Sequence, residues 1–384
     1  MKKAATNKKK EKDGEEEGFS MTSKIASFLN NNKNCHYNDF DIDEYYVSTG
    51  SLNFDRAIEG GFSSGIVRFC GATEAGKSSE ALDVVTNFQK IHGEDSMALF
   101  IKAEGRLSKS MRERSSLSFT TDVQEWDSKN VFVFKCNVFE TIVEFLETFL
   151  GVCEKAEKKL VVVLDSLDGL VRKSDLTKSI EDQQVAGVPL LLDRFLRRFS
   201  LRVGEMGHLL ILVSQVRAKI DINKYSSNPQ KSLSGSGGNS VAHYPDWIIT
   251  FLKRNKSDNI LEFPDAMPDL KKNRIIGHNV TVAIEKSTND TTGYRVTYPV
   301  KHGVSSGSAI WVEKEVVENM ILDGYIIKAG SWFSFSKEAE SLCPLLPKNF
   351  KIQGMSGIHQ LFNDNKDIMS FWYEKLTGKK NVVV

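Results

Sequence analysis

The sequence contains no apolar run close to the roughly 18 residues that a membrane-spanning helix requires. Lysines at the N-terminus are not followed by an apolar segment, so we expect neither a membrane anchor nor a secretory signal. The five cysteines are few and lack Cys-x-x-Cys spacing, lying at positions 35, 70, 136, 153 and 343. An odd, unclustered set predicts reduced thiols in a cytoplasmic protein rather than a disulfide scaffold.

A marked charge imbalance is also missing. Lys and Arg number 51 against 50 Asp and Glu, which gives a net charge of +1 at pH 7. Any nucleic-acid site must therefore be a local patch. The seven histidines form no ligand-spaced pair, so they predict no metal site. Hydrophobic residues at 40% and charged residues at 26% are typical of a soluble globular protein.

What the sequence does have is one octapeptide, residues 71–78, that fits the phosphate-binding pattern GxxxxGK[ST]. An apolar, strand-like run precedes it at 65–70, and a stripe at helical spacing follows over 77–89. Backbone N–H groups at a helix N-terminus can bind phosphate oxygens, while Lys77 would reach the β- and γ-phosphates and Ser78 would bind Mg²⁺. The residues expected to hold the nucleotide are Gly71, Ala72, Thr73, Glu74, Ala75, Gly76, Lys77, Ser78 and Ser79.

Short apolar segments alternate with helical stretches from residue 47 to about 303. The segments at 97–101, 131–135, 160–164 and 209–213 are almost continuously hydrophobic. Strands with that composition are buried on both faces, as in a parallel sheet covered by helices. Two later segments flank Asn289 and Asp290, a turn signal typical of an antiparallel hairpin. The pattern predicts an α/β P-loop fold with a mostly parallel, twisted sheet.

Three polar residues follow strand-like segments of this series. Asp165 ends the run 161–165 and is a candidate Mg²⁺ ligand, directly or through water; an ordinary turn residue is the alternative. Glu104 follows the run 98–103 and could orient and deprotonate an attacking water, although a solvated loop carboxylate is common there. Gln215 ends a third strand and could detect a γ-phosphate, or could simply terminate the strand.

Two long polar stretches interrupt the pattern, at about 174–187 and 221–239. Loops of this length inside a compact domain are usually functional or disordered. The second contains Lys224, Tyr225 and Lys231 and ends in a glycine-rich cluster. Lysines contact phosphates and an aromatic ring can stack on bases, so the loop is either a single-stranded nucleic-acid site or a solvated linker.

The chain ends differ from this central part. Residues 1–18 are rich in Lys and Glu and predict a disordered tail. Residues 19–46 begin with an amphipathic helix, over 19–30, that should pack on its own domain or on a neighbouring subunit. After the core at 47–303, residues 304–384 predict a small α/β domain with a helix near 313–323, a strand at 330–335 and a last helix near 357–376.

Taken together, several segments resemble the RecA family of recombinases, including its phage UvsX-like branch. The likeness spans about residues 47–376 in the family's order. It rests on segments 49–55, 71–78, 100–104, 164–166, 214–220, 237–239 and 321–335.

The resemblance implies site residues beyond the phosphate loop. Glu104 would be the general base, Gln215 the switch between the ATP and DNA sites, and Lys286 a lysine that reaches the γ-phosphate of the neighbouring subunit. The resemblance implies DNA binding by Val185, as an apolar wedge between base triplets, and by residues that hold the strand's phosphates, namely Arg198, Arg217, Gly237, Gly238 and Asn239. The composition of the second loop adds Lys224, Tyr225 and Lys231 as candidate DNA-binding residues. Residues 174–187 and 221–239 would be the DNA-binding loops.

The sequence departs from the family pattern at three places. RecA proteins usually have two lysines reaching into the neighbouring site, but the first falls on Ile284. The tyrosine that usually stacks on adenine falls near Met111, which leaves base specificity open. Residues 255–273 resemble an insertion.

The resemblance implies a DNA-dependent ATPase that uses ATP and Mg²⁺ and forms a helical filament on single-stranded DNA. It would pair that strand with homologous duplex DNA, in the cytoplasm of a bacterial or phage-infected cell, with single-strand-binding and mediator proteins as candidate partners. The alternatives are a hexameric helicase or KaiC-like ATPase on the same core, or a non-catalytic recombinase paralogue. Intact Lys77, Asp165 and Glu104 speak against the last.

Overall fold

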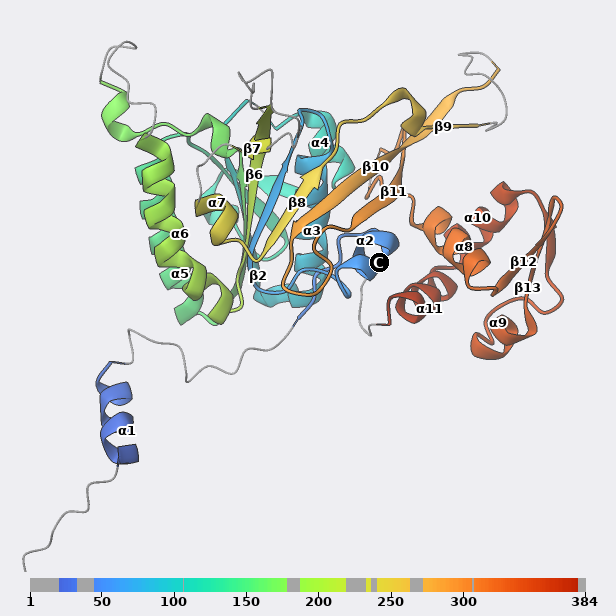
Figure 1. Cartoon of the computed structure of the whole chain (residues 1–384), viewed down its shortest axis with the longest axis horizontal. Coiled ribbons are helices and arrows are strands. Elements are labelled where there is room, and N and C mark those ends of the chain that lie inside the picture. Colours follow the sequence, from blue (N-terminus) through green and yellow to red (C-terminus); the bar gives the residue numbers. More distant parts are fainter. Residues whose placement is uncertain are drawn as a thin grey trace, which may run out of the picture. The chain divides into compact units, whose positions relative to one another are not determined.

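The computed structural model describes residues 21–32, 45–105, 107–177, 187–218, 233–235, 240–262, 272–305 and 307–378. The chain divides into two compact units, Met1–Asp41 and Ile42–Val384. In the first, the expected helix is confirmed as α1 (Met21–Asn31) (Figure 1). Its apolar residues Ile25 and Phe28 are 52% and 65% exposed. What this helix packs on stays a prediction.

The second unit is built on a large sheet with strand order β11-β10-β8-β1-β6-β5-β2-β4-β3, with β7 paired to β6 and β9 to β10. The strands from β8 to β3 along this order are parallel to their neighbours, and β10 and β11 are antiparallel. The strands are β1 (Gly65–Gly71), β2 (Ser96–Lys102), β3 (Ser118–Thr120), β4 (Asn130–Lys135), β5 (Lys159–Asp165), β6 (Leu209–Ala218), β7 (Leu233–Gly235), β8 (Trp247–Phe251), β9 (Asn259–Leu261), β10 (Ile275–Lys286) and β11 (Arg295–Lys301). The mostly parallel α/β fold is confirmed.

Helices cover both faces of this sheet, which explains why its central strands are apolar throughout. On one face, α3 (Lys77–His92) packs with alternate residues of β1, β2 and β5 in one core cluster. On the other face, α5 (Phe139–Lys155) and α6 (Gly187–Glu205) run side by side over the remaining residues of those strands (Figure 1). Shorter helices in this part are α2 (Leu52–Ala57), α4 (Lys109–Arg114) and α7 (Ser240–His243).

The C-terminal residues form a third core cluster around Trp372, Tyr373 and Phe362. Its elements are α8 (Val312–Leu322), β12 (Ile326–Ala329), β13 (Trp332–Phe335), α9 (Lys337–Leu342), β14 (Lys351–Gln353), α10 (Met355–Asp364) and α11 (Lys366–Thr377). The single last helix expected near 357–376 is wrong, because α10 ends before Asn365. The backbone of Asn365 is not helical (φ −122°, ψ 83°), and its side chain donates to Leu361 O at 2.8 Å. An asparagine that hydrogen-bonds the preceding turn favours a helix end.

The polar loop expected at 221–239 and the insertion expected at 255–273 each contain a strand that the sequence did not indicate. Within 221–239, β7 pairs antiparallel with the end of β6. Within 255–273, β9 pairs with β10 after a short 3-10 turn, Lys256–Asp258. Among the described residues, no helix combines the length and apolar character needed to cross a membrane.

Candidate nucleotide-binding site

The phosphate loop joins β1 to α3 as the motif requires. Gly71 ends β1 opposite Phe251 of β8, with a φ of +147°. A Cβ at Gly71 would lie 2.2 Å from Phe251 O, so only glycine fits there. Gly76 has a left-handed backbone (φ +103°) and precedes the first turn of α3. The loop therefore directs the N-terminus of α3, with its unpaired N–H groups, toward the carboxyl edge of the sheet.

Lys77 lies across this loop. Its Nζ donates to the carbonyl oxygens of Gly71 at 3.0 Å and Ala72 at 2.6 Å, and the residue is only 7% exposed. Burial lowers the pKa of the Lys77 ammonium, and the negative charge of Asp165 opposes that shift. An ammonium held in this position is suited to binding phosphate oxygens.

Ser78 and Asp165 meet beside the loop, although they are 87 residues apart in the sequence. The Ser78 hydroxyl donates to Asp165 Oδ2 at 3.1 Å. Asp165 is the last residue of β5 and is 5% exposed. A hydroxyl and a carboxylate are hard oxygen ligands of the kind that Mg²⁺ binds, and nucleotide phosphates and water can complete its coordination. The residues present therefore fit a nucleotide-bound Mg²⁺.

Asp165 has a second partner that the sequence alone did not indicate. Lys102 ends β2, and its Nζ forms a salt bridge of 2.6 Å with Asp165 Oδ2. The two residues stand opposite each other in the β2–β5 register. The only signal in the sequence is a lysine at the end of an apolar strand, two positions before Glu104.

Glu104 follows β2 and reaches the segment after β5. Its Oε2 accepts a hydrogen bond of 2.6 Å from the Ser166 hydroxyl, while the residue as a whole is exposed. Close packing fixes this approach, because a Cβ on Gly169 would lie 2.7 Å from Ala103 O and 2.9 Å from Glu104 Cβ. Glu104 is thus an exposed residue at the carboxyl edge of the sheet, with Oε2 bonded to Ser166.

Gln215 lies opposite Gly71 in the β1–β6 register, at the point where β1 enters the phosphate loop. Its backbone N–H donates to Asp168 Oδ2 at 2.6 Å. Asp168 belongs to the short turn Leu167–Gly169 that follows β5. Gln215 therefore connects the phosphate loop and the β5 edge to the segment that leads toward residue 219.

A cavity of about 400 Å³ opens beside the phosphate loop. Met111 and Arg114 of α4 line it together with Val300 and Ile310. Met111, the position to which the resemblance assigns an adenine-stacking tyrosine, is therefore a lining residue of this cavity.

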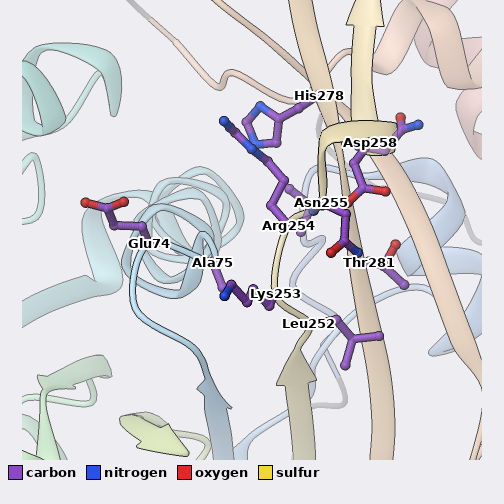
Figure 2. Close-up of a pocket in the computed structure, with 11 residues that line it drawn as sticks. Glu74, Ala75, Leu252, Lys253, Arg254, Asn255, Asp258, His278 and Thr281 are labelled. Carbon is purple, nitrogen blue, oxygen red and sulfur yellow. Dashed lines mark hydrogen bonds between the residues drawn. The ribbon is translucent and has the colours of Figure 1, made fainter.

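An adjoining pocket of about 100 Å³ lies between the loop and the segment after β8 (Figure 2). Figure 2 shows the Arg254 side chain extending alongside the imidazole of His278. His278 Nδ1 is 2.8 Å from His302 Nε2. Burial, followed by the charge of Arg254, lowers the pKa of His278 to about 4, so the imidazole is neutral at pH 7. Arg254 therefore carries the positive charge of this pocket together with Lys253.

The remaining expected residues lie elsewhere or outside the described part. Lys286 does not line the cavity; its Nζ donates to His243 O at 2.6 Å, and Ile284 is a fully buried core residue. Arg198 on α6 pairs with Glu147 on α5 at 2.7 Å. Arg217 lies in β6. Outside the described residues are Val185, Lys224, Tyr225, Lys231, Gly237, Gly238 and Asn239.

The fold and this site define a class. A phosphate loop joins a central parallel strand to a helix, and the Asp165 carboxylate accepts a hydrogen bond from Ser78. This arrangement defines a P-loop nucleotide-binding protein.

Comparison with known proteins identifies the family within this class. The family model of the RecA N-terminal domain matches residues 33–291. The RecA protein of Mesoplasma florum is 25% identical over 332 residues, covering 86% of this chain and 85% of the relative. The RecA protein of Caulobacter vibrioides is 25% identical over 324 residues, covering 84% of this chain and 78% of the relative. The RecA protein of Wolinella succinogenes is 25% identical over 338 residues, covering 86% of this chain and 82% of the relative. The chain therefore belongs to the RecA family and is a recombinase of DNA recombination and repair.

Proposed function

We propose that this recombinase hydrolyses ATP to ADP and phosphate, assembles into a helical filament on single-stranded DNA, and pairs that strand with homologous duplex DNA. The observation that carries the proposal is the convergence of Lys77, Ser78 and Asp165 on one phosphate loop, with Glu104 held at the same edge of the sheet.

Each of these side chains has a role that its position supports. Lys77 would bind the β- and γ-phosphates, and Ser78 and Asp165 would hold Mg²⁺. Bound Mg²⁺ would neutralise charge that develops on the transferred phosphoryl group. Glu104 is exposed at this edge and would orient and deprotonate the attacking water.

Assembly would complete the site. Lys286 would reach the γ-phosphate bound by an adjoining protomer, since it does not line the cavity of its own chain. The exposed apolar residues Ile25 and Phe28 of α1 make this helix the candidate contact between protomers.

DNA binding is proposed for the two loops. Gln215 would connect nucleotide binding with the DNA loop, because it stands opposite Gly71 at the start of the segment toward that loop. The DNA-binding residues named from the sequence belong to these loops, to α6 and, for Arg217, to β6. Action on DNA in the cytoplasm, with single-strand-binding and mediator proteins, accords with this activity.

The test is the rate of ATP hydrolysis with and without single-stranded DNA, together with negative-stain imaging of the same sample. We expect the strand to stimulate hydrolysis and helical filaments to form only when nucleotide and Mg²⁺ are present. A closed ring would favour the hexameric helicase or KaiC-like alternative, and filaments without hydrolysis would favour a non-catalytic paralogue.

A further inference from the structure

Asp165, the proposed Mg²⁺ ligand, forms a salt bridge with a lysine of the same chain, Lys102. Lys102 Nζ lies 2.6 Å from Asp165 Oδ2, and the two side chains are only 13% and 7% exposed. The same oxygen atom accepts the hydrogen bond from Ser78 at 3.1 Å. Lys102 and Ser78 therefore share one carboxylate oxygen of Asp165, the proposed Mg²⁺ ligand.

The strand geometry places Lys102 there. Side chains alternate along β2, with Ala98 and Phe100 in the cluster on the α3 side and Leu99 and Ile101 in the cluster on the opposite side. Lys102 continues the first set and so projects toward the phosphate loop. Lys135 occupies the same register on the next strand, β4, but is exposed. The position of Lys102 on the sheet thus brings its side chain to Asp165. The pair is not a chance contact between surface side chains.

This pairing changes what the site binds. A divalent cation that approaches Asp165 must compete with the Lys102 ammonium and is repelled by it. Ser78 and Asp165 alone offer a metal ion few oxygen ligands, and Mg²⁺ prefers six. A nucleotide brings phosphate oxygens as further ligands, and its negative charge offsets that of the ammonium.

We propose that Lys102 is a positioning residue of the ATP site, which holds Asp165 and prevents a divalent cation from binding before the nucleotide does. This inference rests on the proposed ATP binding at the same loop. Lys102 makes divalent-metal binding depend on the nucleotide, so that the site takes up the metal–nucleotide complex instead of the free ion.

The experiment measures Mn²⁺ binding to the nucleotide-free, full-length protein by electron paramagnetic resonance of the unbound ion. In Lys102→Met, the Mn²⁺ dissociation constant should fall about tenfold, the size of effect that a close, partly desolvated charge pair produces. Lys102→Arg keeps the positive charge and should bind Mn²⁺ as the wild type does. Lys135→Met removes an exposed lysine from the same register of the sheet and should have no effect.

A second substitution tests whether any gain in Mn²⁺ affinity depends on Asp165. Adding Asp165→Asn to Lys102→Met should abolish the tighter Mn²⁺ binding, and a thermal melt of each variant checks folding. Equal Mn²⁺ affinity of Lys102→Met and wild type, or a gain that survives Asp165→Asn, would overturn the inference.

Failure of this inference is distinguishable from failure of the proposed function. Binding of a fluorescent ATP analogue to the wild type in Mg²⁺ is measured separately. Absence of nucleotide binding would refute the proposed function. Normal nucleotide binding combined with unchanged Mn²⁺ affinity would refute the role of Lys102 alone.

Discussion

The Tyr373 hydroxyl donates a hydrogen bond of 2.7 Å to Asp55 Oδ2, across 318 residues of sequence. Both residues are fully buried. Asp55 also accepts from the Ser48 hydroxyl at 2.5 Å and from Thr49 N at 2.8 Å. This network joins α11, the last helix, to the segment that leads into the phosphate-loop strand. The C-terminal helices and the nucleotide-binding core therefore share one set of buried polar contacts.

Tyr373→Phe should destabilise the protein by about 1–3 kcal/mol, because a buried carboxyl group is deprived of a hydrogen-bond donor. Urea unfolding measures the change in free energy. Tyr294→Phe, at a position that is 58% exposed, is the matched control and should change stability little. Equal effects of the two substitutions would show that the Asp55 bond contributes nothing.

The contribution of two buried carboxyl groups, Glu315 and Asp55, to stability should fall as pH rises from about 4.5 to 8. Burial raises the pKa of Glu315 from its ordinary value of 4.5 to about 8 and that of Asp55 to about 6. The folded state then binds protons that the unfolded state has released. The resulting stabilisation is complete at pH values below the pKa of the unfolded state, and it is lost as pH rises through the pKa of the folded state. Glu315 faces the Ser51 hydroxyl and the N–H groups of Leu52 and Asn53, with Asp55 nearby.

Glu315→Gln tests this assignment. Between pH 6 and 8, where Glu315 alone of this pair still titrates, the stability of the wild type should fall more steeply than that of the variant, by about 1 kcal/mol per pH unit. Denaturant unfolding at several pH values provides the measurement. Parallel pH profiles for the two proteins would mean that Glu315 does not bind the extra proton.

Gly71→Ala should destabilise the protein by several kcal/mol and abolish nucleotide binding, since the new Cβ would lie 2.2 Å from Phe251 O. The control is Gly204→Ala in α6, where no atom beyond the adjoining residues and the backbone of the same helix lies within 4 Å of the added Cβ. That change should stabilise the helix by roughly 0.5–1 kcal/mol. Thermal unfolding and titration with a fluorescent nucleotide separate the two outcomes. Normal nucleotide binding by Gly71→Ala would contradict the loop geometry.

Lys77→Ala should reduce ATP hydrolysis by about 100-fold or more, because it removes a charge aimed at the reacting phosphates. Steady-state phosphate release is the measurement. Lys109→Ala, a lysine whose side chain is 83% exposed, should leave the rate unchanged. Turnover near the wild-type rate in Lys77→Ala would remove Lys77 from the chemistry.

Arg217→Ala and Lys231→Ala should each weaken binding to single-stranded DNA. Each cation removed from a DNA phosphate should flatten the dependence of log affinity on log salt by about 0.7. Fluorescence anisotropy of a labelled oligonucleotide at several salt concentrations gives the slope. An unchanged slope in both variants would place the DNA away from Arg217 and Lys231.

Local patterns predicted most of the fold and the centre of the site. The phosphate loop and the strand ending in Asp165 could be identified because each combines an apolar run with a functional residue at its end. The helix break at Asn365 could not be predicted, since the apolar spacing of residues 357–376 continues across it.

The Lys102–Asp165 pair could not be predicted from sequence patterns either. It depends on which strands are neighbours and on their register, and neither is encoded by spacing along the chain. Likewise, β7 consists of Leu233–Gly235 in a polar, glycine-rich stretch and forms only by pairing with β6.

The proposal that adjoining protomers share one ATP site is tested most directly by mixing two variants that should each be inactive. Lys77→Ala lacks the loop lysine, and Lys286→Ala lacks the lysine proposed to act on the neighbour. In a random equal mixture on single-stranded DNA, about a quarter of the head-to-tail interfaces would combine an intact Lys77 with an intact Lys286. We predict that the mixture hydrolyses ATP at about a quarter of the wild-type rate. A mixture no more active than the sum of its two components would contradict ATP binding between protomers.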